Sequence, residues 1–304
     1  MSSLPTVAIA GASGLLGANI ARAILQPSLR SKFANVIVLA RSSSKKTEEF
    51  VEAGAKLRQY SEGNVKEALE GVDVLINAVG SSGNNFKETL VRSLPGTSVR
   101  LYFPSEFGVN HYIHDFAHKE WDFKKKLFRL ASEIIPDVRM CRVYAGLFLE
   151  ESIGPWFGFD TKHGKYEAVG SPSQPSSYVS MGDVGRALAV LASMPPDEVP
   201  TEVHLNGDSK SFLEIAEAMK RHGAGQIDVT SVPLDEYKAQ VLSKPSKTEE
   251  YLRLLMGEGK IDHSKNGLGN HSHLLLGAGK VDAFKTIEDL AKETHGKPWA
   301  DYDD

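Results

Sequence analysis

The sequence predicts an α/β fold, with a doubly wound parallel sheet and a smaller α+β lobe toward the carboxyl terminus. Short apolar runs alternate with helical patterns along the first half of the chain, which is typical of parallel strands joined by right-handed helical crossovers. The first apolar run ends in a turn with three glycines at three-residue spacing. At 304 residues, the chain is long enough to bury a large core and to carry an appended lobe.

Six apolar runs are predicted as strands, and the segments between them as helices. The strands are expected at residues 6–10, 36–40, 55–60, 72–79, 98–103 and 138–143. Ligands of such sheets bind beyond the carboxyl ends of the strands, close to the point where the strand order reverses. Candidate functional residues are therefore those that follow each predicted strand.

The turn after the first predicted strand contains Gly11, Gly14 and Gly17. Glycine at the first two positions lets the turn close and lets backbone N–H groups approach a pyrophosphate, whereas the third lets the helix lie close to the sheet. The amino terminus of that helix carries partial positive charge, which attracts anions. The pattern predicts a Rossmann-type dinucleotide site with contacts from Gly11, Ser13, Gly14, Leu15, Leu16 and Gly17.

Residues 41–46, which follow the second predicted strand, are basic and rich in serine. An acidic residue at this place usually binds the free ribose 2′-hydroxyl of NAD, and none is present. Arginine binds a phosphate in a bidentate manner, and serine and lysine can assist it. We therefore predict NADPH or NADP+ as the cofactor, with Arg41 and Lys45 near its 2′-phosphate. A solvated basic turn is the alternative.

Small residues follow the fourth predicted strand, at positions 77–81. They would let the chain pass close to the ribose and the nicotinamide of the cofactor. The cofactor contacts predicted here are Asn77, Ala78, Val79, Gly80 and Ser81.

The fifth predicted strand ends in Phe-Pro-Ser-Glu-Phe-Gly, residues 103–108. With this motif the chain resembles the NmrA-like group of atypical short-chain dehydrogenases, particularly isoflavone reductase, pinoresinol-lariciresinol reductase and phenylcoumaran benzylic ether reductase. The glycine turn, residues 79–81, residues 145–149 and residues 284–288 are similar too. The resemblance implies an NADPH-dependent oxidoreductase that transfers hydride to a small aromatic or phenolic molecule. It also implies cofactor contacts from Pro104, Ser105, Glu106 and Phe107.

Ordinary short-chain dehydrogenases use a tyrosine and a lysine four residues later, and no tyrosine of this chain has lysine at that spacing. The resemblance instead implies a lone lysine beside the cofactor, which counting from residues 107–108 through Phe123 places at Lys126. A lysine desolvated near a nicotinamide has a lowered pKa, which suits it to proton transfer. The alternative is a solvated helix face on which Lys126 pairs with Asp122.

After the sixth predicted strand, the family usually has Asn-Phe-Phe-Ala-Gly, whereas residues 142–146 of this chain read Arg-Val-Tyr-Ala-Gly. The resemblance implies that the ring of Tyr144 packs against the nicotinamide. Arg142 departs from the family's small amide, which puts plant-type lignan or isoflavonoid substrates in doubt. A loop with Trp156, Phe157 and Phe159 is a candidate apolar pocket, or it pins the lobe to the core. The candidate substrate contacts are Tyr144, Phe148 and Trp156.

Glycines and prolines break the periodicity of residues 151–177, which predicts a loop-rich excursion. Capping boxes at Ser180 and Ser211 predict helices through Leu191 and Arg221. The resulting division assigns residues 1–150 and 178–207 to an NADP-binding domain, and residues 151–177 and 208–304 to a substrate-binding lobe.

The formal net charge of −4 implies no strongly basic face, so nucleic acid is not an expected partner. The only cysteine, Cys141, lies in an apolar run; a disulfide within the chain is impossible, which fits the cytoplasm. Asn19 and Arg22 interrupt the apolar amino-terminal run and no basic segment precedes it, so neither a secretory signal nor a membrane span is expected. A small-molecule substrate is the expected partner, and a homodimer is compatible with the sequence.

Two groups of histidines have spacings that could bind a metal ion: His111, His114 and His118 with Asp115, and His271 with His273. The resemblance requires no metal, and histidines are common in loops. No metal site is therefore expected.

A second function remains open, that of a non-catalytic redox sensor like the fungal transcriptional regulator for which the family is named. Such a protein would bind the dinucleotide and report its redox state through a protein partner. Lys126 and residues 103–108 favour the enzyme, while the weak resemblance of the carboxyl-terminal lobe leaves room for the sensor. Fold alone does not separate the two.

Overall fold

The computed structural model describes residues 4–61, 63–277 and 281–302. Within them, the largest sheet has six parallel strands in the order β3-β2-β1-β4-β5-β6. The strand order reverses between β1 and β4, which confirms the predicted doubly wound topology. The strands are β1 (Thr6–Ala10), β2 (Asn35–Ala40), β3 (Lys56–Gln59), β4 (Val74–Asn77), β5 (Leu101–Phe103) and β6 (Arg139–Met140).

The central strands bury both faces, because successive side chains of a strand point to opposite sides of the sheet. In β1, Val7 and Ile9 belong to one apolar cluster, whereas Ala8 and Ala10 belong to another. This is why β1 and β2 read as uninterrupted apolar runs in the sequence.

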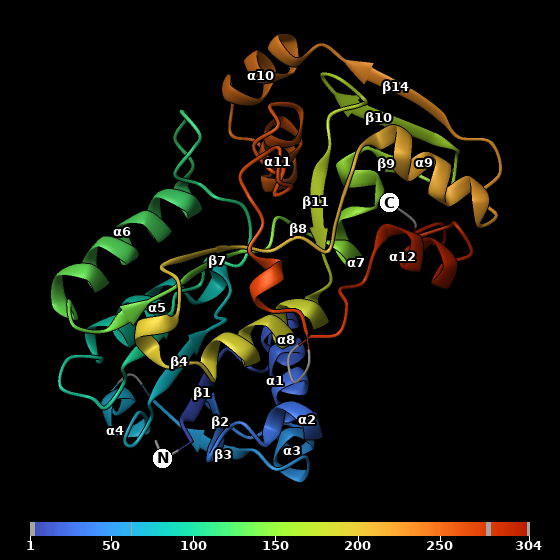
Figure 1. Ribbon diagram of the computed structural model, residues 1–304. Coiled ribbons are helices and arrows are strands. Elements are labelled where there is room, and N and C mark those ends of the chain that lie inside the picture. Colours follow the sequence, from blue (N-terminus) through green and yellow to red (C-terminus); the bar gives the residue numbers. More distant parts are fainter. Residues whose placement is uncertain (1–3, 62, 278–280, 303–304) are drawn as a thin grey trace.

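Helices cover the two faces of the sheet (Figure 1). The first cluster includes side chains of α1 (Leu15–Leu25), α2 (Pro27–Arg30), α3 (Lys45–Glu52) and α8 (Met181–Ala192). The second includes side chains of α4 (Val65–Ala68), α5 (Asn84–Arg92) and α6 (Lys119–Ile134).

Three predicted strands differ clearly from the observed ones. The run at 98–103 contributes only its last three residues, as β5. The run at 72–79 contributes only β4, since Ala78 and Val79 leave the sheet and the Val79 N–H donates to Oδ1 of Asn77 at 3.2 Å. The run at 138–143 is divided between β6 and β7 (Arg142–Tyr144), and β7 pairs with the distant β12 (Glu202–His204). A long-range pairing thus divides the run at 138–143, whereas a contact between residues two apart marks the end of β4.

The remaining strands and helices form a lobe above the large sheet (Figure 1), with its own apolar cluster. One small sheet has the order β13-β11-β8 and another the order β14-β10-β9. The strands are β8 (Leu147–Phe148), β9 (Phe159–Asp160), β10 (Lys165–Val169), β11 (Ser176–Val179), β13 (Asp208–Lys210) and β14 (Asp228–Val232). The helices are α7 (Leu149–Ser152), α9 (Phe212–Arg221), α10 (Leu234–Leu242), α11 (Thr248–Gly257) and α12 (Ile287–Glu293).

Short 3₁₀ turns complete the described structure. They are η1 (Ser81–Gly83), η2 (Pro155–Phe157), η3 (Pro196–Glu198) and η4 (Ser272–Leu274). The predicted loop-rich excursion at 151–177 therefore contains η2, β9, β10 and the start of β11. Among the described helices, none combines the length and the hydropathy that crossing a membrane requires.

The two predicted capping boxes have different outcomes. Ser211 and Glu214 cap each other's backbone N–H at the start of α9, as predicted. At α8, the Ser180 hydroxyl accepts from the Asp183 N–H, but the Asp183 carboxylate does not return to Ser180. It accepts the Lys285 N–H at 2.7 Å and pairs with Arg186. Asp183 therefore joins α8 to the segment that precedes α12.

Candidate functional site

The glycine turn has the close approaches that a dinucleotide cradle needs. Gly11 has a φ of +81°, and a Cβ placed on it would lie 2.7 Å from the carbonyl carbon of Ala78. A Cβ on Gly17 would lie 2.1 Å from the carbonyl oxygen of Gly11. No side chain caps the amino terminus of α1, and its first turn has no acidic residue. Its N–H groups and partial positive charge are therefore available to an anion.

A groove of about 750 Å³ runs along the carboxyl ends of β1, β2 and β4. Of its lining, the sequence predicted Gly11, Ser13, Gly14, Arg41, Ala78, Val79 and Gly80. It did not predict Leu39, Ala40, Tyr60, Ser61, Ser82, Gly83, Asn85 and Phe86. Tyr60 and Phe86 stack with ring centroids 4.3 Å apart, which gives one wall of the groove a flat aromatic character.

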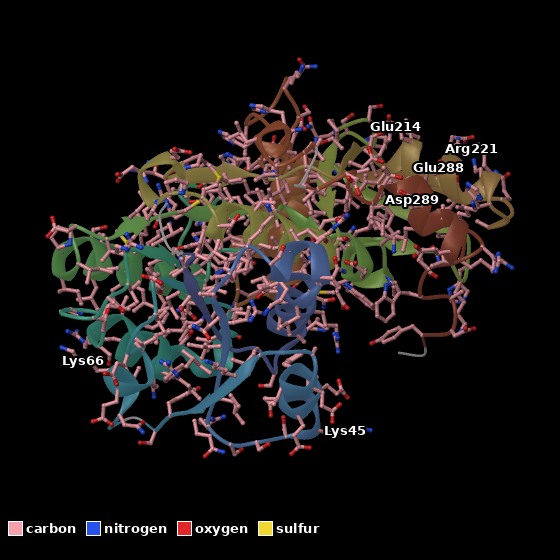
Figure 2. All side chains as sticks on the ribbon, turned by 60° about the horizontal axis from the view of Figure 1, so that its bottom comes forward. Lys45, Lys66, Glu214, Arg221, Glu288 and Asp289 are labelled. Carbon is pink, nitrogen blue, oxygen red and sulfur yellow. The ribbon has the colours of Figure 1, made fainter. Side chains whose placement is uncertain are left out.

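The basic segment after β2 contributes Arg41 and, differently from the prediction, Lys46. Arg41 is exposed and lines the groove. Lys46 donates from Nζ to the carbonyl oxygen of Ser13 at 3.0 Å. Lys45 lies at the outer edge of α3 and points into solvent (Figure 2), outside the lining of the groove. The serine hydroxyl of Ser44 caps α3.

A second, nearly closed pocket adjoins the groove at Val79. The Ser105 hydroxyl donates to the carbonyl oxygen of Val79 at 2.9 Å, and Asn77, which precedes the groove residues Ala78 and Val79, lines the pocket. Its volume of about 10 Å³ is room for about one water molecule. A ligand larger than a water molecule would fit only if this pocket widened. Its lining is Asn77, Lys87, Tyr102, Pro104, Ser105, Glu106, Lys124, Leu127 and Phe128, which we call the polar pocket.

Glu106 is the carboxylate of the polar pocket and is only 1% exposed. Burial raises the pKa of Glu106. The hydrogen bond to His111 and the charges of Lys124 and Arg142 lower it by more, so the pKa is lowered overall. Burial also lowers the pKa of His111, and this outweighs the attraction of Glu106. Glu106 and His111 are hydrogen-bonded through Nε2 of His111, and His111 Nδ1 is left without a partner.

Lys124 and not Lys126 is the lysine of α6 that lines the polar pocket, and this corrects the expected surroundings of Lys126. Lys126 is 63% exposed and lies 3.7 Å from Oε2 of Glu88. The pairing expected with Asp122 is made by Lys125, at 3.3 Å. Lys124 is partly buried and lines the pocket. Burial lowers the pKa of Lys124 more than Glu106 and Glu120 raise it.

Helical periodicity gives the reason for this difference. The buried residues of α6 are Trp121, Leu127 and Ala131, and Lys124 shares their face because residues three and seven apart on a helix are neighbours. Lys126 is offset from that face. The same signal in α5 identifies Lys87, which precedes the buried Leu90 and Val91 by one turn. Both pocket lysines were therefore detectable as cations on apolar helix faces.

Several predicted cofactor contacts lie outside both linings. Leu15 is 60% exposed at the start of α1, Leu16 packs against the core, and Phe107 is inside it. Gly17 lets α1 pack closely against the backbone of Gly11. Ser81 is exposed in η1.

The aromatic residues predicted to contact substrate do not come together. Trp156 packs against Trp299 and Tyr302, with ring centroids 4.9 and 5.3 Å away. Phe159 stacks on Phe212 inside the lobe, where Phe157 is also buried. These aromatics pack within the lobe and against the carboxyl-terminal segment, as in the alternative interpretation of this loop.

Tyr144 and Phe148 are also core residues. Tyr144 is 0% exposed and stacks on His204 at 5.1 Å, and its hydroxyl has no partner. Phe148 is partly buried and packs against the core of the large sheet. Neither residue lines the groove or the polar pocket.

Arg142, the departure from the family pattern, stands at the edge of the polar pocket. Its guanidinium lies 4.5 Å from the ring centroid of Tyr112 and 4.4 Å from that of Phe128, and it pairs with Glu202. Cation–π contacts of this kind hold aromatic rings in place. Arg142 thus ties Phe128, a pocket residue, to β7 and β12.

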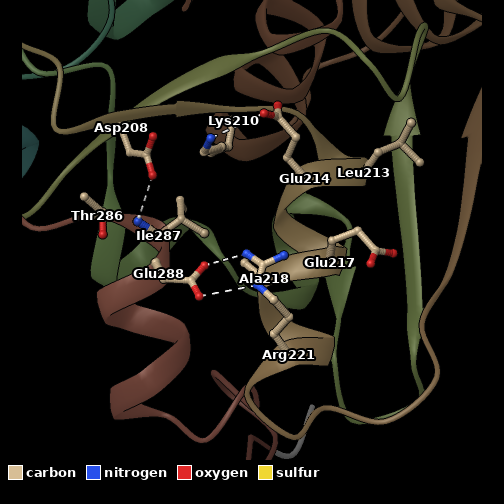
Figure 3. A pocket seen from close by; sticks show the side chains of 10 residues that line it. All are labelled: Asp208, Lys210, Leu213, Glu214, Glu217, Ala218, Arg221, Thr286, Ile287 and Glu288. Carbon is tan, nitrogen blue, oxygen red and sulfur yellow. Dashed lines mark hydrogen bonds and ion pairs between the residues drawn. The ribbon is translucent and has the colours of Figure 1, made fainter.

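A hollow of about 530 Å³, larger than the polar pocket, lies on the lobe between α9 and α12 (Figure 3). Two ion pairs stand in its lining, Lys210 at 3.3 Å from Glu214 and Arg221 at 2.6 Å from Glu288, and Asp208 and Glu217 add two further carboxylates. Figure 2 places Glu214, Arg221 and Glu288 at the end of the molecule away from Lys45. This hollow is therefore separate from the groove.

The histidines considered as metal ligands form aromatic contacts instead. His114 stacks on Phe116 at 4.4 Å, and His118 stacks on Trp121 at 4.0 Å. His271 accepts the backbone N–H of His204 at Nδ1. Within the described residues, no three His, Cys, Asp or Glu side chains are placed to hold a metal ion.

The large sheet and the glycine turn define a Rossmann-type α/β protein. Residues 4–265 match the model of the NmrA-like family, and the chain belongs to this family, as the resemblance predicted. No match was found among curated protein sequences.

Solved structures share the fold over nearly the whole chain. The leucoanthocyanidin reductase–NADPH complex from Vitis vinifera has a TM-score of 0.76 at 18% identity, covering 95% of this chain and 99% of that one. Isoflavone reductase has a TM-score of 0.76 at 18% identity, with 96% and 99% covered. The NADPH complex of a quinone oxidoreductase from Escherichia coli has a TM-score of 0.67 at 16% identity, with 94% and 99% covered.

Proposed function

We propose that this protein is an NADPH-dependent reductase of the isoflavone-reductase-like type, acting on a small aromatic or phenolic molecule. The observation that carries the proposal is the junction of the groove with the polar pocket at Val79. Because Ser105 of the pocket bonds to Val79 of the groove, Lys124, whose pKa is lowered, would lie beside a groove large enough for a dinucleotide. The NADPH-bound reductases among the similar structures support the same assignment.

The residues of the groove fit NADPH. The uncapped amino terminus of α1 and the turn from Gly11 to Gly14 would hold the pyrophosphate. Arg41 would bind the 2′-phosphate, since it is exposed and no acid competes for it. The stacked pair of Tyr60 and Phe86 offers a flat face for the adenine ring. Bound there, NADPH supplies the hydride and the protein supplies orientation and electrostatics.

Lys124 takes the proton-transfer role that the sequence assigned to Lys126. Reduction of a double bond needs one proton besides the hydride, and the Lys124 ammonium can donate it to a substrate oxygen. Burial lowers the pKa of Lys124, which brings it closer to neutral pH, where general acids work best. The charge of Glu106 acts on the same amine and favours its protonated form.

An aromatic substrate suits the walls of the polar pocket. Tyr102 and Phe128 contribute rings to its lining, and Arg142 and Tyr112 extend this aromatic surface. A structure of pinoresinol bound to a related reductase gives a precedent for phenolic ligands in this fold. Arg142 would make the substrate range of this chain differ from that of the plant enzymes.

The proposal is tested by titrating the protein with NADPH and NADH and then assaying quinones, enones, aldehydes and phenolic ethers. We expect preferential binding of NADPH and NADPH oxidation with at least one of these classes. Failure to bind NADPH would contradict the proposal. Binding without turnover, together with a protein partner that distinguishes NADPH from NADP+, would favour the redox sensor.

We also propose a cytoplasmic location and the division into an NADP-binding domain and a substrate-binding lobe. Cys141 is 0% exposed, and burial raises the pKa of its thiol to about 12, so it is an inert core residue. The separate apolar cluster of the lobe supports the domain division. A homodimer remains a proposal that a measured molar mass in solution would test.

A further inference from the structure

The polar pocket is lined by a second lysine, Lys87 of α5, which has no part in the proton transfer proposed above. Its side chain is only 2% exposed. Among the residues that the structure describes, no hydrogen bond or ion pair reaches the amine of Lys87 or that of Lys124. Polar groups that are buried without a protein partner are usually bonded to a water molecule or a ligand. The two amines therefore call for a partner that the chain itself does not supply.

The amines of both lysines, and not only their aliphatic stems, lie at the polar pocket. The charges of two carboxylates, Glu106 and Glu120, act on both amines, and Glu106 is itself a lining residue. Asn84 of α5 donates to Oε2 of Glu120 on α6 at 3.0 Å. Lys87 and Lys124 each follow this contact by about one helical turn, so they reach the same pocket from two neighbouring helices.

The polar pocket has the size of one oxygen atom and is rich in hydrogen-bond donors. Its volume of about 10 Å³ corresponds to a single water-sized site. Besides the two amines, the hydroxyl of Tyr102 lines it, and this hydroxyl accepts from Nδ2 of Asn77 at 3.1 Å and can still donate its own proton. The carboxylate of the pocket, Glu106, is already hydrogen-bonded to His111. These surroundings favour an acceptor oxygen, above all one that carries negative charge.

We propose that the polar pocket binds a single terminal oxygen of the substrate, held by the amines of Lys87 and Lys124, and that a water molecule takes this place in the free protein. The inference rests on the proposed function and narrows the substrate class to conjugated carbonyl compounds such as quinones and enones. Hydride addition forms a C–H bond on such a molecule and moves an electron pair onto its carbonyl oxygen. That oxygen then takes a proton from Lys124, which regains one from solvent.

Lys87 is a catalytic residue in this account, because its ammonium contacts the oxygen on which negative charge develops. Burial lowers the pKa of Lys87 to about 8, with the charge of Lys124 as the next cause. The amine therefore remains mostly protonated at neutral pH and can stabilise the charge without giving up its proton.

The first test is a crystal structure of the wild-type protein without cofactor, at a resolution that shows ordered water molecules. We expect one water in the polar pocket, within about 3.2 Å of Nζ of both Lys87 and Lys124. A pocket without this water, or a water that contacts only one of the two amines, would overturn the proposal. This test does not depend on the folding of any variant.

The second test is a pH titration of para-nitrophenol bound to the protein, because this probe carries one ionisable oxygen and its anion absorbs visible light. We expect the bound probe to ionise about one pH unit below the free probe, which is about tenfold in favour of the anion. Lys87→Met should lose most of this shift, whereas Lys126→Met, on the exposed face of α6, should keep it. The protein groups that titrate around the probe are Lys87, Lys124, Glu106, Glu120, Tyr102 and His111.

Three results of the second test would each overturn the proposal: no binding of the probe, an unshifted ionisation in the wild type, or an equal shift in Lys87→Met. Neither test measures turnover. A protein that passes both tests but reduces no carbonyl compound keeps the oxygen site and contradicts the proposed function. A reductase that fails them keeps the proposed function and loses this inference.

Discussion

A lysine amine changes its proton affinity with its surroundings, and three consecutive lysines of α6 have three different surroundings. Lys124 lines the polar pocket, Lys125 pairs with Asp122, and Lys126 pairs with Glu88 in solvent. Counting along the sequence from a motif selects among neighbours only to within one or two residues. Burial decides which of them is suited to proton transfer.

Replacing Lys124 by glutamine should lower kcat by about 100-fold or more, because it removes a general acid. The affinity for NADPH should change little, since the phosphates are held by α1 and Arg41. Lys126→Gln is the matched control and should retain turnover within about twofold, as expected of an exposed ion pair. Steady-state kinetics of both variants on one active substrate give the comparison. Full activity in Lys124→Gln, with loss in Lys126→Gln, would restore the original assignment.

Replacing Arg41 by alanine should weaken NADPH binding by roughly 10- to 100-fold, which is the value of a charge-assisted phosphate contact. NADH lacks the 2′-phosphate, so its affinity should be almost unaffected. Lys45→Ala is a control, because Lys45 points into solvent outside the groove (Figure 2). Fluorescence titrations measure all four affinities. Equal loss for NADPH and NADH in Arg41→Ala would rule out the phosphate contact.

At the scale of helices and strands, the elements that were predicted correctly are those determined by short-range sequence patterns. The apolar runs of β1 and β2 and the cap of α9 were predicted correctly because their signals are local. The partner of β7 lies far along the chain and has no local signal. In the candidate site, the glycine turn and Arg41 could likewise be predicted from local patterns. The position of Trp156 could not, because it depends on packing against the distant Trp299.

The contact of α1 with the glycine turn gives a prediction for the element. A Cβ on Gly17 would lie 2.1 Å from the carbonyl oxygen of Gly11, whereas the nearest atom to a Cβ on Gly14 is 3.2 Å away. We expect Gly17→Ala to lower the free energy of unfolding by about 3 kcal/mol through overpacking, and to weaken NADPH binding. Gly14→Ala should have the smaller effect on stability. Urea unfolding measures both variants, and equal losses would contradict the close approach.

At the scale of the whole molecule, buried histidines make stability depend on pH. His204 and His263 are 7% and 0% exposed, with ring centroids 4.9 Å apart. Burial, together with neighbouring histidines, lowers the pKa of His204 to about 4 and that of His263 to about 3. Both rings lie near the junction of β7 and β12, which joins the large sheet to the lobe.

Folding lowers the pKa of these histidines. Above the unfolded-state pKa of about 6.5, both the folded and the unfolded chain hold them neutral, so the protein keeps its full stability. As the pH falls below that value, the unfolded chain takes up protons that the folded chain excludes. We therefore expect the free energy of unfolding to fall between about pH 6.5 and pH 4, by roughly 2 kcal/mol per histidine at about pH 5. Urea unfolding at about pH 7.5 and about pH 5 measures the difference.

His204→Phe serves as the control for this pH effect. Both ring nitrogens of His204 lack partners, so phenylalanine keeps the stacking on Tyr144 and loses no hydrogen bond. The variant should be close to the wild type in stability at about pH 7.5 and lose less than the wild type at about pH 5. An acid sensitivity as large as that of the wild type would exclude His204 as a cause.

The central claim is that NADPH lies in the groove with its reactive end at the polar pocket. The measurement that tests it most directly is a crystal structure of the protein with NADPH bound. The account predicts phosphates at the amino terminus of α1 and at Arg41, and a nicotinamide ring at Val79, within about 4 Å of the Lys124 side chain. A nicotinamide beside the exposed Lys126, or NADPH bound away from the groove, would contradict it.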